Sequence, residues 1–172
     1  MRKIRYSVAM SLDGYIAGPK GEADWIVIDP EFNFTELWAQ FDTLLMGRRT
    51  YEAAKARLGK ASMQAMKTIV VSRTLQQTDH PEAIILSELN RNWVQVLRAQ
   101  SGKDIWLMGG GEMFRLLLEM HVVDTVEVSI VPVLLGGGVA LLPPSVRQTR
   151  LTLSSHKIYP SGLVSLIYEV QQ

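Results

Sequence analysis

The sequence predicts a three-layer α/β/α fold around a mixed, mainly parallel central sheet, with an antiparallel hairpin at the C-terminal end. Strand-like and helix-like segments alternate over the first two thirds of the chain, as in parallel βαβ units. The last third is instead rich in β-forming residues and has a turn signal at residues 159–162. The 172 residues match the usual size of one domain, so we expect a single domain over residues 1–172.

Short apolar runs and the turns that end them define the first half. In order, we expect strand 4–10, helix 31–41, strand 43–46, helix 48–58 and strand 68–71. The first strand stops before the turn signal Asp13-Gly14. Apolar side chains recur at helical spacing from Phe34 to Phe41, which predicts the first helix. The β-branched run at 68–71 is typical of a buried parallel strand.

The second half continues this alternation and then becomes β-rich. In order, we expect strand 83–86, a helix between Ser87 and Gly102, strand 105–108, helix 112–120, a β-rich stretch over 122–133 and two final strands flanking 159–162. Ser87 is the predicted cap of its helix. The residues expected to share a face of that helix are Leu89, Trp93, Val96 and Leu97. Apolar residues alternate from Val164 to Val170, as in a half-buried antiparallel strand.

Composition excludes several classes of function. The chain has no cysteine, which excludes disulfides, Cys-ligated metals and a thiolate nucleophile. With 18 Lys+Arg against 17 Asp+Glu, the net charge of +1 gives little support for nucleic-acid binding. The three histidines have no metal-ligand spacing, so no metal is expected. No targeting segment and no apolar run of about 20 residues is visible, so we expect a cytoplasmic protein without a membrane partner.

Two strand-to-helix junctions are candidate phosphate sites, because helix N-termini present free N–H groups. At residues 46–52 (MGRRTYE), two arginines follow Gly47 and oppose the helix dipole. An anionic ligand would explain them, and solvated arginines are the alternative. At 108–114, three glycines carry an entropic cost that a pyrophosphate or a tight turn would explain. Phe114 stands where the Rossmann fingerprint needs a further glycine.

Five segments in order resemble the dihydrofolate reductase superfamily. Residues 46–52, 69–73 and 108–111 are similar to its three NADPH-binding segments. Residues 9–17 (AMSLDGYIA) and 132–138 (PVLLGGG) resemble the branch that includes the C-terminal reductase domain of the bifunctional riboflavin-biosynthesis protein. The resemblance extends from about residue 3 to residue 170. It implies a dihydrofolate reductase-like fold, NADPH as cofactor and a homodimer.

The resemblance assigns cofactor contacts residue by residue, and it implies a cis peptide bond at Gly109–Gly110. The implied cofactor-binding residues are Ala9, Ile16, Gly47, Arg48, Arg49, Thr50, Ser72, Arg73, Met108, Gly109, Gly110, Gly111, Glu112 and Met113. Of these, Ala9 and Ile16 would hold the nicotinamide carboxamide. Arg49 and Arg73 would contact the 2′-phosphate.

A carboxyl group is expected to supply the proton that accompanies hydride transfer. The resemblance places it near 29–31, which favours Glu31, then Asp29, with Asp13 third. The first two also suit a helix N-terminus, and Asp13 could instead form an Asx turn at Gly14. Trp25 could line the substrate pocket or belong to the core.

The substrate half departs from the family pattern. Tyr6, Ser7 and Val8 occupy the first strand, where the riboflavin reductases typically carry a lysine. Apolar residues fill the stretch before Asp42, where a basic residue and a histidine would grip a ribose phosphate. We therefore expect an NADPH-dependent reductase of a small heterocycle, nearest to 5-amino-6-(5-phosphoribosylamino)uracil reductase. A dihydrofolate reductase-type activity and a non-catalytic dinucleotide-binding protein are the alternatives.

Overall fold

The computed structural model describes residues 1–144 and 148–171, and for residues 58–64 only the backbone. Its strands are β1 (Ile4–Ser11), β2 (Tyr15–Ala17), β3 (Phe41–Gly47), β4 (Lys67–Val71), β5 (Ile84–Leu86), β6 (Asp104–Gly109), β7 (Thr125–Val131), β8 (Val139–Ala140), β9 (Leu151–Ile158) and β10 (Val164–Val170). Its helices are α1 (Phe34–Ala39), α2 (Arg48–Gln64), the 3-10 turn η1 (Gln77–Asp79), α3 (Arg91–Ala99) and α4 (Gly111–Glu119).

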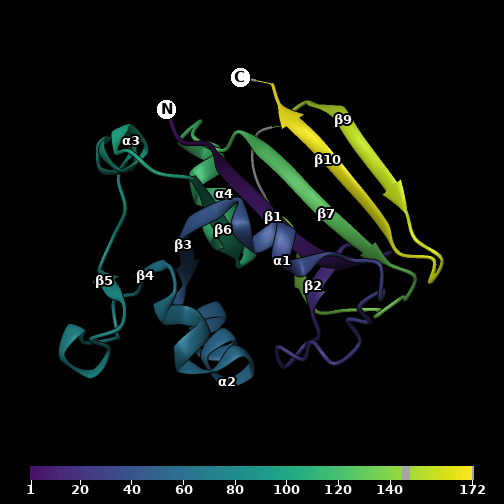
Figure 1. The fold of residues 1–172 in the computed structure, drawn as a ribbon, viewed down its shortest axis with the longest axis horizontal. Helices are drawn as coiled ribbons and strands as arrows, with labels where there is room; N and C mark the ends of the chain where they lie inside the picture. The colour runs from purple at the N-terminus through teal and green to yellow at the C-terminus, as the bar shows by residue number, and fades with distance from the viewer. Residues whose placement is uncertain (145–147, 172) are drawn as a thin grey trace.

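The central sheet has the strand order β5-β4-β3-β6-β1-β7-β10-β9. The strands from β5 to β7 in this order run parallel, whereas β10 is antiparallel to β7 and β9 is antiparallel to β10. In Figure 1, β7, β10 and β9 lie side by side, with β9 outermost. The strands β2 and β8 form a separate small sheet. The predicted mixed sheet with a C-terminal hairpin is therefore confirmed.

Side chains that alternate along the strands form two cores, one on each face of the sheet. On one face, Leu45 of β3 and Leu107 of β6 pack with side chains of α3 and α4. On the other face, Leu44 and Met46 pack with side chains of α1 and α2. The expected three layers are thus present. Within the described part of the chain, no helix is long and apolar enough to cross a bilayer.

The connections reverse direction between β3 and β6, which are neighbours in the sheet. After β3 the chain continues through α2 to β4, whereas after β6 it continues through α4 to β7, beyond β1. Ligands of open parallel sheets bind at such a switch point, outside the carboxyl ends of the strands. Both predicted phosphate junctions begin there, since β3 ends at Gly47 and β6 at Gly109.

Three helices differ from the sequence prediction. The first predicted helix is shortened, because the Asn33 side chain caps α1 by accepting from Glu36 N, while Phe41 instead opens β3. The predicted Ser87 cap is wrong, because Asn90 accepts from Trp93 N at 2.9 Å and α3 begins at Arg91. With this start, Val94 lies in the core, whereas Val96, which was expected on the buried face, is 58% exposed. The second predicted helix runs past Leu58 to Gln64.

Candidate functional site

The three segments predicted to bind NADPH lie next to one another. Gly47 at the end of β3 pairs with Val71 at the end of β4, and Met46 pairs with Gly109 at the end of β6. A Cβ placed on Gly109 would lie 3.5 Å from Thr50 Oγ1 in α2. The fold therefore brings the start of α2, the start of α4 and the end of β4 to one edge of the sheet.

Both helices at this edge begin on a glycine that provides no side-chain cap. Gly47 is the N-cap of α2 and Gly110 is the N-cap of α4. The first N–H groups of a helix have no partner within the helix, and a side chain usually accepts from one of them. Here these donors face the carboxyl edge of the sheet without such a cap, which is an arrangement suited to anions.

The three glycines at the junction of β6 and α4 lack a side chain for different reasons. Gly109 has φ +130°, which disfavours other residues, and its bond to Gly110 is cis as expected. A Cβ on Gly111 would lie 2.6 Å from the Ala140 carbonyl oxygen, so packing requires glycine there. Gly110 has φ −85°, and its Cβ would meet only Thr50 Oγ1 at 3.6 Å. Neither packing nor φ requires glycine at Gly110, so its missing side chain leaves open space beside Thr50.

The three arginines at this edge differ in whether they have a polar partner. Arg48 forms an exposed ion pair with Glu52 at 3.1 Å. Arg49 and Arg73 are exposed and have no polar partner among the side chains that the structure describes. Ser72 is buried, and its Oγ accepts from Thr74 N at 3.2 Å and from Leu75 N at 3.1 Å. Ser72 therefore shapes the loop that carries Arg73.

The remaining predicted cofactor residues occupy several environments. Ala9 lies late in β1, opposite Ser129 of β7. Ile16 lies in β2, which pairs with β8 beside the main sheet. Glu112, in the first turn of α4, forms an ion pair with Arg115 at 2.8 Å. Its carboxylate is therefore already engaged.

An apolar cavity lies on the α1 side of the sheet and shares Ala9 with the predicted cofactor contacts. It holds about 470 Å³ of empty space, including solvent at its mouth. Its walls are Ser7, Val8, Ala9, Ile26, Val27, Ile28, Phe32, Phe34, Leu37, Trp106, Ser129, Val131 and Leu163. None of these residues has a titratable side chain. We refer to this cavity as the β1–β7 pocket.

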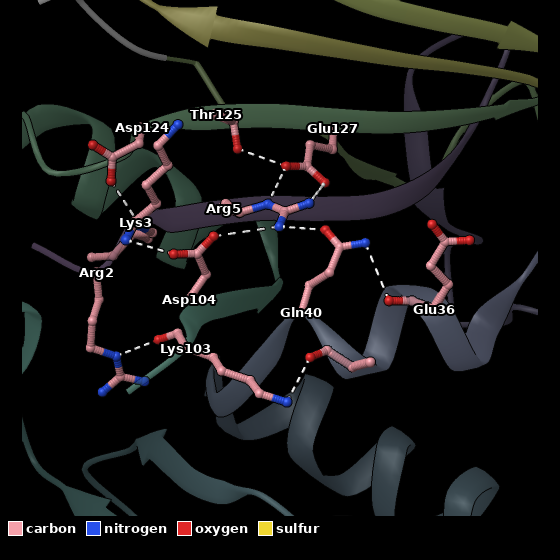
Figure 2. Close-up of polar contacts among 12 residues, drawn as sticks. Arg2, Lys3, Arg5, Glu36, Gln40, Lys103, Asp104, Asp124, Thr125 and Glu127 are labelled. Atoms are coloured by element: carbon pink, nitrogen blue, oxygen red, sulfur yellow. Dashed lines mark hydrogen bonds and ion pairs between the residues drawn. The ribbon is translucent and has the colours of Figure 1, made fainter. Parts of the chain in front are cut away.

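The outer wall of the β1–β7 pocket is formed by residues 20–36 and runs into α1. Within this segment, the buried Asp29 carboxylate accepts from Ser161 N at 3.0 Å, in the turn between β9 and β10. Just after α1, Arg5 of β1 donates to Gln40 Oε1 at 2.7 Å. Figure 2 shows Arg5 between Gln40 and Glu127, whose carboxylate accepts from Arg5 Nε at 2.6 Å. These bonds hold the wall segment, residues 20–36, and α1 over β1 and β7.

The three candidate proton donors differ in what their carboxylates do. The Ser11 hydroxyl and the N–H groups of Leu135 and Gly136 hold the pKa of Asp13 below its ordinary value. Asp13 thus ties the 135–136 loop to the turn after β1, and it makes no Asx turn to Gly14.

The other two candidates lie near the start of the pocket wall. The Ser161 hydroxyl and the N–H groups of Glu31 and Ser161 lower the pKa of Asp29. A lowered pKa disfavours proton donation near neutral pH. Glu31 is exposed next to the lining residue Phe32, and its carboxylate has no polar partner among the described residues. Of the three, Glu31 alone has a carboxylate without a structural role.

Trp25 packs beside the pocket without lining it. Its ring contacts the cluster of Val131, Tyr159 and Leu163, and its Nε1 donates to the Glu22 carbonyl at 3.1 Å. Sequence reasoning did not assign Ser7, Ser129 or Trp106 to the substrate pocket. The available signal was a serine on each of two central strands, since serine is mostly exposed in folded proteins.

The chain resembles known proteins over nearly its whole length. The family model described as RibD C-terminal domain matches residues 2–165. The uncharacterized protein YyaP of Bacillus subtilis (strain 168) is 32% identical over 97% of this chain and 94% of its own. Riboflavin biosynthesis protein RibD of Mycobacterium tuberculosis (strain CDC 1551 / Oshkosh) is 28% identical over 95% of this chain, which spans 54% of that protein.

Two solved structures have the same fold at lower identity. A Shewanella sp. PV-4 protein assigned provisionally to riboflavin biosynthesis has TM-score 0.80 and 23% identity, with both chains fully covered. The Thermotoga maritima diaminohydroxyphosphoribosylaminopyrimidine deaminase/5-amino-6-(5-phosphoribosylamino)uracil reductase has TM-score 0.75 and 15% identity, over 99% of this chain and 57% of that one. The family match and these likenesses confirm the dihydrofolate reductase-like fold implied by the five sequence segments.

Proposed function

The chain belongs to the RibD C-terminal domain family, and from this premise we propose that it is an NADPH-dependent reductase of a small heterocycle. The observation that carries the proposal is the pair of uncapped, glycine-started helices at neighbouring strand ends. Two arginines without described partners, Arg49 and Arg73, stand at the same edge. This edge offers N–H donors for a pyrophosphate and cations for a further phosphate.

The β1–β7 pocket is the proposed substrate site. Ala9 belongs both to its wall and to the predicted nicotinamide contacts, so a substrate there would lie beside the reactive end of the cofactor. When bound, NADPH supplies the hydride, which adds to the carbon of a C=N or C=O bond. The nitrogen or oxygen then takes a proton, so the product is a CH–NH or CH–OH group.

The chain's own residues would position the substrate and exclude water. Phe32, Phe34 and Trp106 provide apolar and aromatic surface for a flat ring, and the hydroxyls of Ser7 and Ser129 provide polar contacts. Apolar walls keep water away from the reacting bond. Glu31, exposed beside Phe32, is the proposed proton donor.

Cofactor binding tests this function directly. We expect tighter binding of NADPH than of NADH in calorimetric titrations, because Arg49 and Arg73 would pair with the 2′-phosphate. Arg73→Ala should weaken NADPH binding by about 10- to 150-fold, the value of one charge-assisted hydrogen bond, and leave NADH binding unchanged. Arg91→Ala, which removes an exposed arginine at the start of α3, is the matched control.

Equal dissociation constants for the two cofactors in the unchanged protein would contradict NADPH specificity. Tight NADPH binding without turnover on a broad panel of heterocycles would favour a non-catalytic dinucleotide-binding protein instead.

A further inference from the structure

We infer that the β1–β7 pocket takes an uncharged, planar ring compound that carries no phosphate. The inference rests on the proposed function and deepens it, because it names the substrate class. It also sets this chain apart from an enzyme whose substrate carries a ribose phosphate.

The lining offers no group that would bind a phosphate. Its side chains are aliphatic or aromatic except for the hydroxyls of Ser7 and Ser129. The Ser129 hydroxyl is already 3.2 Å from Ser165 Oγ on β10, and the Trp106 Nε1 donates to the Ser7 carbonyl at 2.8 Å. A phosphate placed in such walls would lose its hydration without gaining a cation or several N–H donors in return.

The wall segment would repel an anion. Residues 20–36 contain one basic residue, Lys20. The acidic residues of the same segment are Glu22, Asp24, Asp29, Glu31 and Glu36. A dianionic phosphate close to this segment would therefore meet a net negative charge, and partial burial strengthens this repulsion relative to bulk water.

The described cations close to the pocket already have other partners. Arg5 forms an ion pair with Glu127 on the same face of the sheet. The Lys157 ammonium lies 4.4 Å from the centre of the Tyr159 ring and also interacts with the Asp29 carboxylate. Arg57 of α2 donates to the Ala23 carbonyl, which does not line the pocket.

The mouth of the pocket is apolar, like its interior. Val27 is 63% exposed, Ile28 is 50% exposed and Phe34 is 40% exposed, and all three line the pocket. Exposed apolar side chains that continue a cavity outward are typical of a ligand site. An uncharged ring would cover these apolar side chains, whereas a sugar phosphate would place its own polar groups against them.

The test uses three ring compounds of one shape and different charge. Quinoxaline is uncharged and has C=N bonds, quinoxaline-2-carboxylate is anionic, and N-methylquinoxalinium is cationic. Equilibrium dialysis against the full chain should give a dissociation constant for quinoxaline at least about tenfold below those of the carboxylate and of N-methylquinoxalinium, because the lining has no charged group to pair with either ion. Ribose 5-phosphate should not compete.

Two charge variants link this preference to the pocket. Val27→Lys places a cation at the mouth and should reverse the order of quinoxaline and its carboxylate. Val96→Lys places the same charge on α3, where the valine is 58% exposed, and should leave the order unchanged. Equal effects of the two variants would overturn the inference, as would tighter binding of the carboxylate by the unchanged protein or no binding of any of the three compounds.

NADPH binding, measured on the same preparation, separates the two proposals. NADPH binding together with a preference for the carboxylate would overturn only the substrate class. Quinoxaline binding without NADPH binding would contradict the reductase and support the ligand class of the pocket.

Discussion

Gly110 and Gly111 are adjacent in the chain, yet they lack side chains for different physical reasons. A Cβ on Gly110 fits the protein but would fill the space proposed for the pyrophosphate. A Cβ on Gly111 would lie within 2.6 Å of the Ala140 carbonyl oxygen. Gly110→Ala should therefore abolish measurable NADPH binding and cost less than about 1 kcal/mol of unfolding free energy, the scale of a changed helix cap. Gly111→Ala should cost about 1–3 kcal/mol, the scale of overpacking.

Denaturant unfolding and calorimetric NADPH titration of both variants measure these effects. Full NADPH affinity in Gly110→Ala would show that the cofactor does not approach α4. A Gly111→Ala variant as stable as the unchanged protein would contradict the packing argument.

Glu31 provides a second prediction at this scale. Once a substrate is known, Glu31→Gln should lower turnover by roughly 100-fold, the scale of general acid catalysis, with little change in NADPH affinity. Glu22→Gln, an exposed acid of the same wall segment, is the matched control. Full turnover of Glu31→Gln from acid to alkaline pH would show that water or another group supplies the proton.

Individual residues also show where sequence reasoning reaches its limit. Ser87 and Asn90 are both good helix caps, and the burial of Val94 and Leu97 in the core selects Asn90. The sequence identifies Asp13 and Asp29 as candidate proton donors. Their N–H partners, Leu135 and Ser161, are more than a hundred positions away in the chain, so only the folded structure could identify them.

Among the elements, α2 is fixed to the segment before β5 by one polar cluster. The Tyr51 hydroxyl donates to Glu82 Oε1 at 2.7 Å, and Lys55 Nζ donates to the same oxygen at 2.7 Å. The bonds from Lys55 and Tyr51 lower the pKa of Glu82 to about 2 from 4.5. Because the native pKa lies below the unfolded value, this stabilisation is complete above about pH 5 and is lost as the pH falls towards 2.

Glu82→Gln should therefore destabilise the protein at neutral pH by about 2 kcal/mol, or roughly 4–8 °C in Tm. The difference from the unchanged protein should shrink as the pH falls below about 4. Thermal unfolding followed by circular dichroism at several pH values measures both effects. Glu88→Gln, an exposed acid nearby, should change little, and a Tm difference independent of pH would contradict the assignment.

Most helices and strands could be predicted because their apolar residues recur at the spacing of the element that they form. The glycine junctions Gly47 and Gly109 marked two strand ends correctly. The first helix was overextended because Phe41 fits both a helical face and a strand. Phe41 belongs to β3 because it pairs with Asp104 in β6, and no local sequence pattern reveals that partner.

At the scale of the whole molecule, the outer edge of the sheet bears on self-association. All eight residues of β9 are exposed, and Leu151, Leu153 and Ile158 are 41%, 48% and 70% exposed. A long exposed edge strand with apolar side chains is a template for pairing with another chain. The homodimer stays a prediction, and we propose that β9 takes part in it.

Sedimentation equilibrium tests this proposal. The unchanged protein should have the mass of a dimer, and Ile158→Lys should shift it towards the monomer, whereas Val96→Lys should not. A monomer at every concentration would contradict the prediction.

Across the whole molecule, we propose that the two ends of the parallel strands have different tasks. At the amino ends, ion pairs such as Arg98–Asp124 at 2.8 Å join the elements. At the carboxyl ends, two uncapped helix starts and two arginines without described partners remain available. The predicted cofactor contacts and the β1–β7 pocket meet at Ala9, so binding and chemistry would share one side of the molecule.

Amide hydrogen exchange with and without NADPH tests this claim most directly. The account predicts that NADPH slows exchange at residues 47–50 and 109–113, where helix N–H groups would bind phosphates, and leaves residues 2–5 and 124–127 unchanged. Slowed exchange confined to the amino ends of the strands, or no change at saturating NADPH, would contradict it.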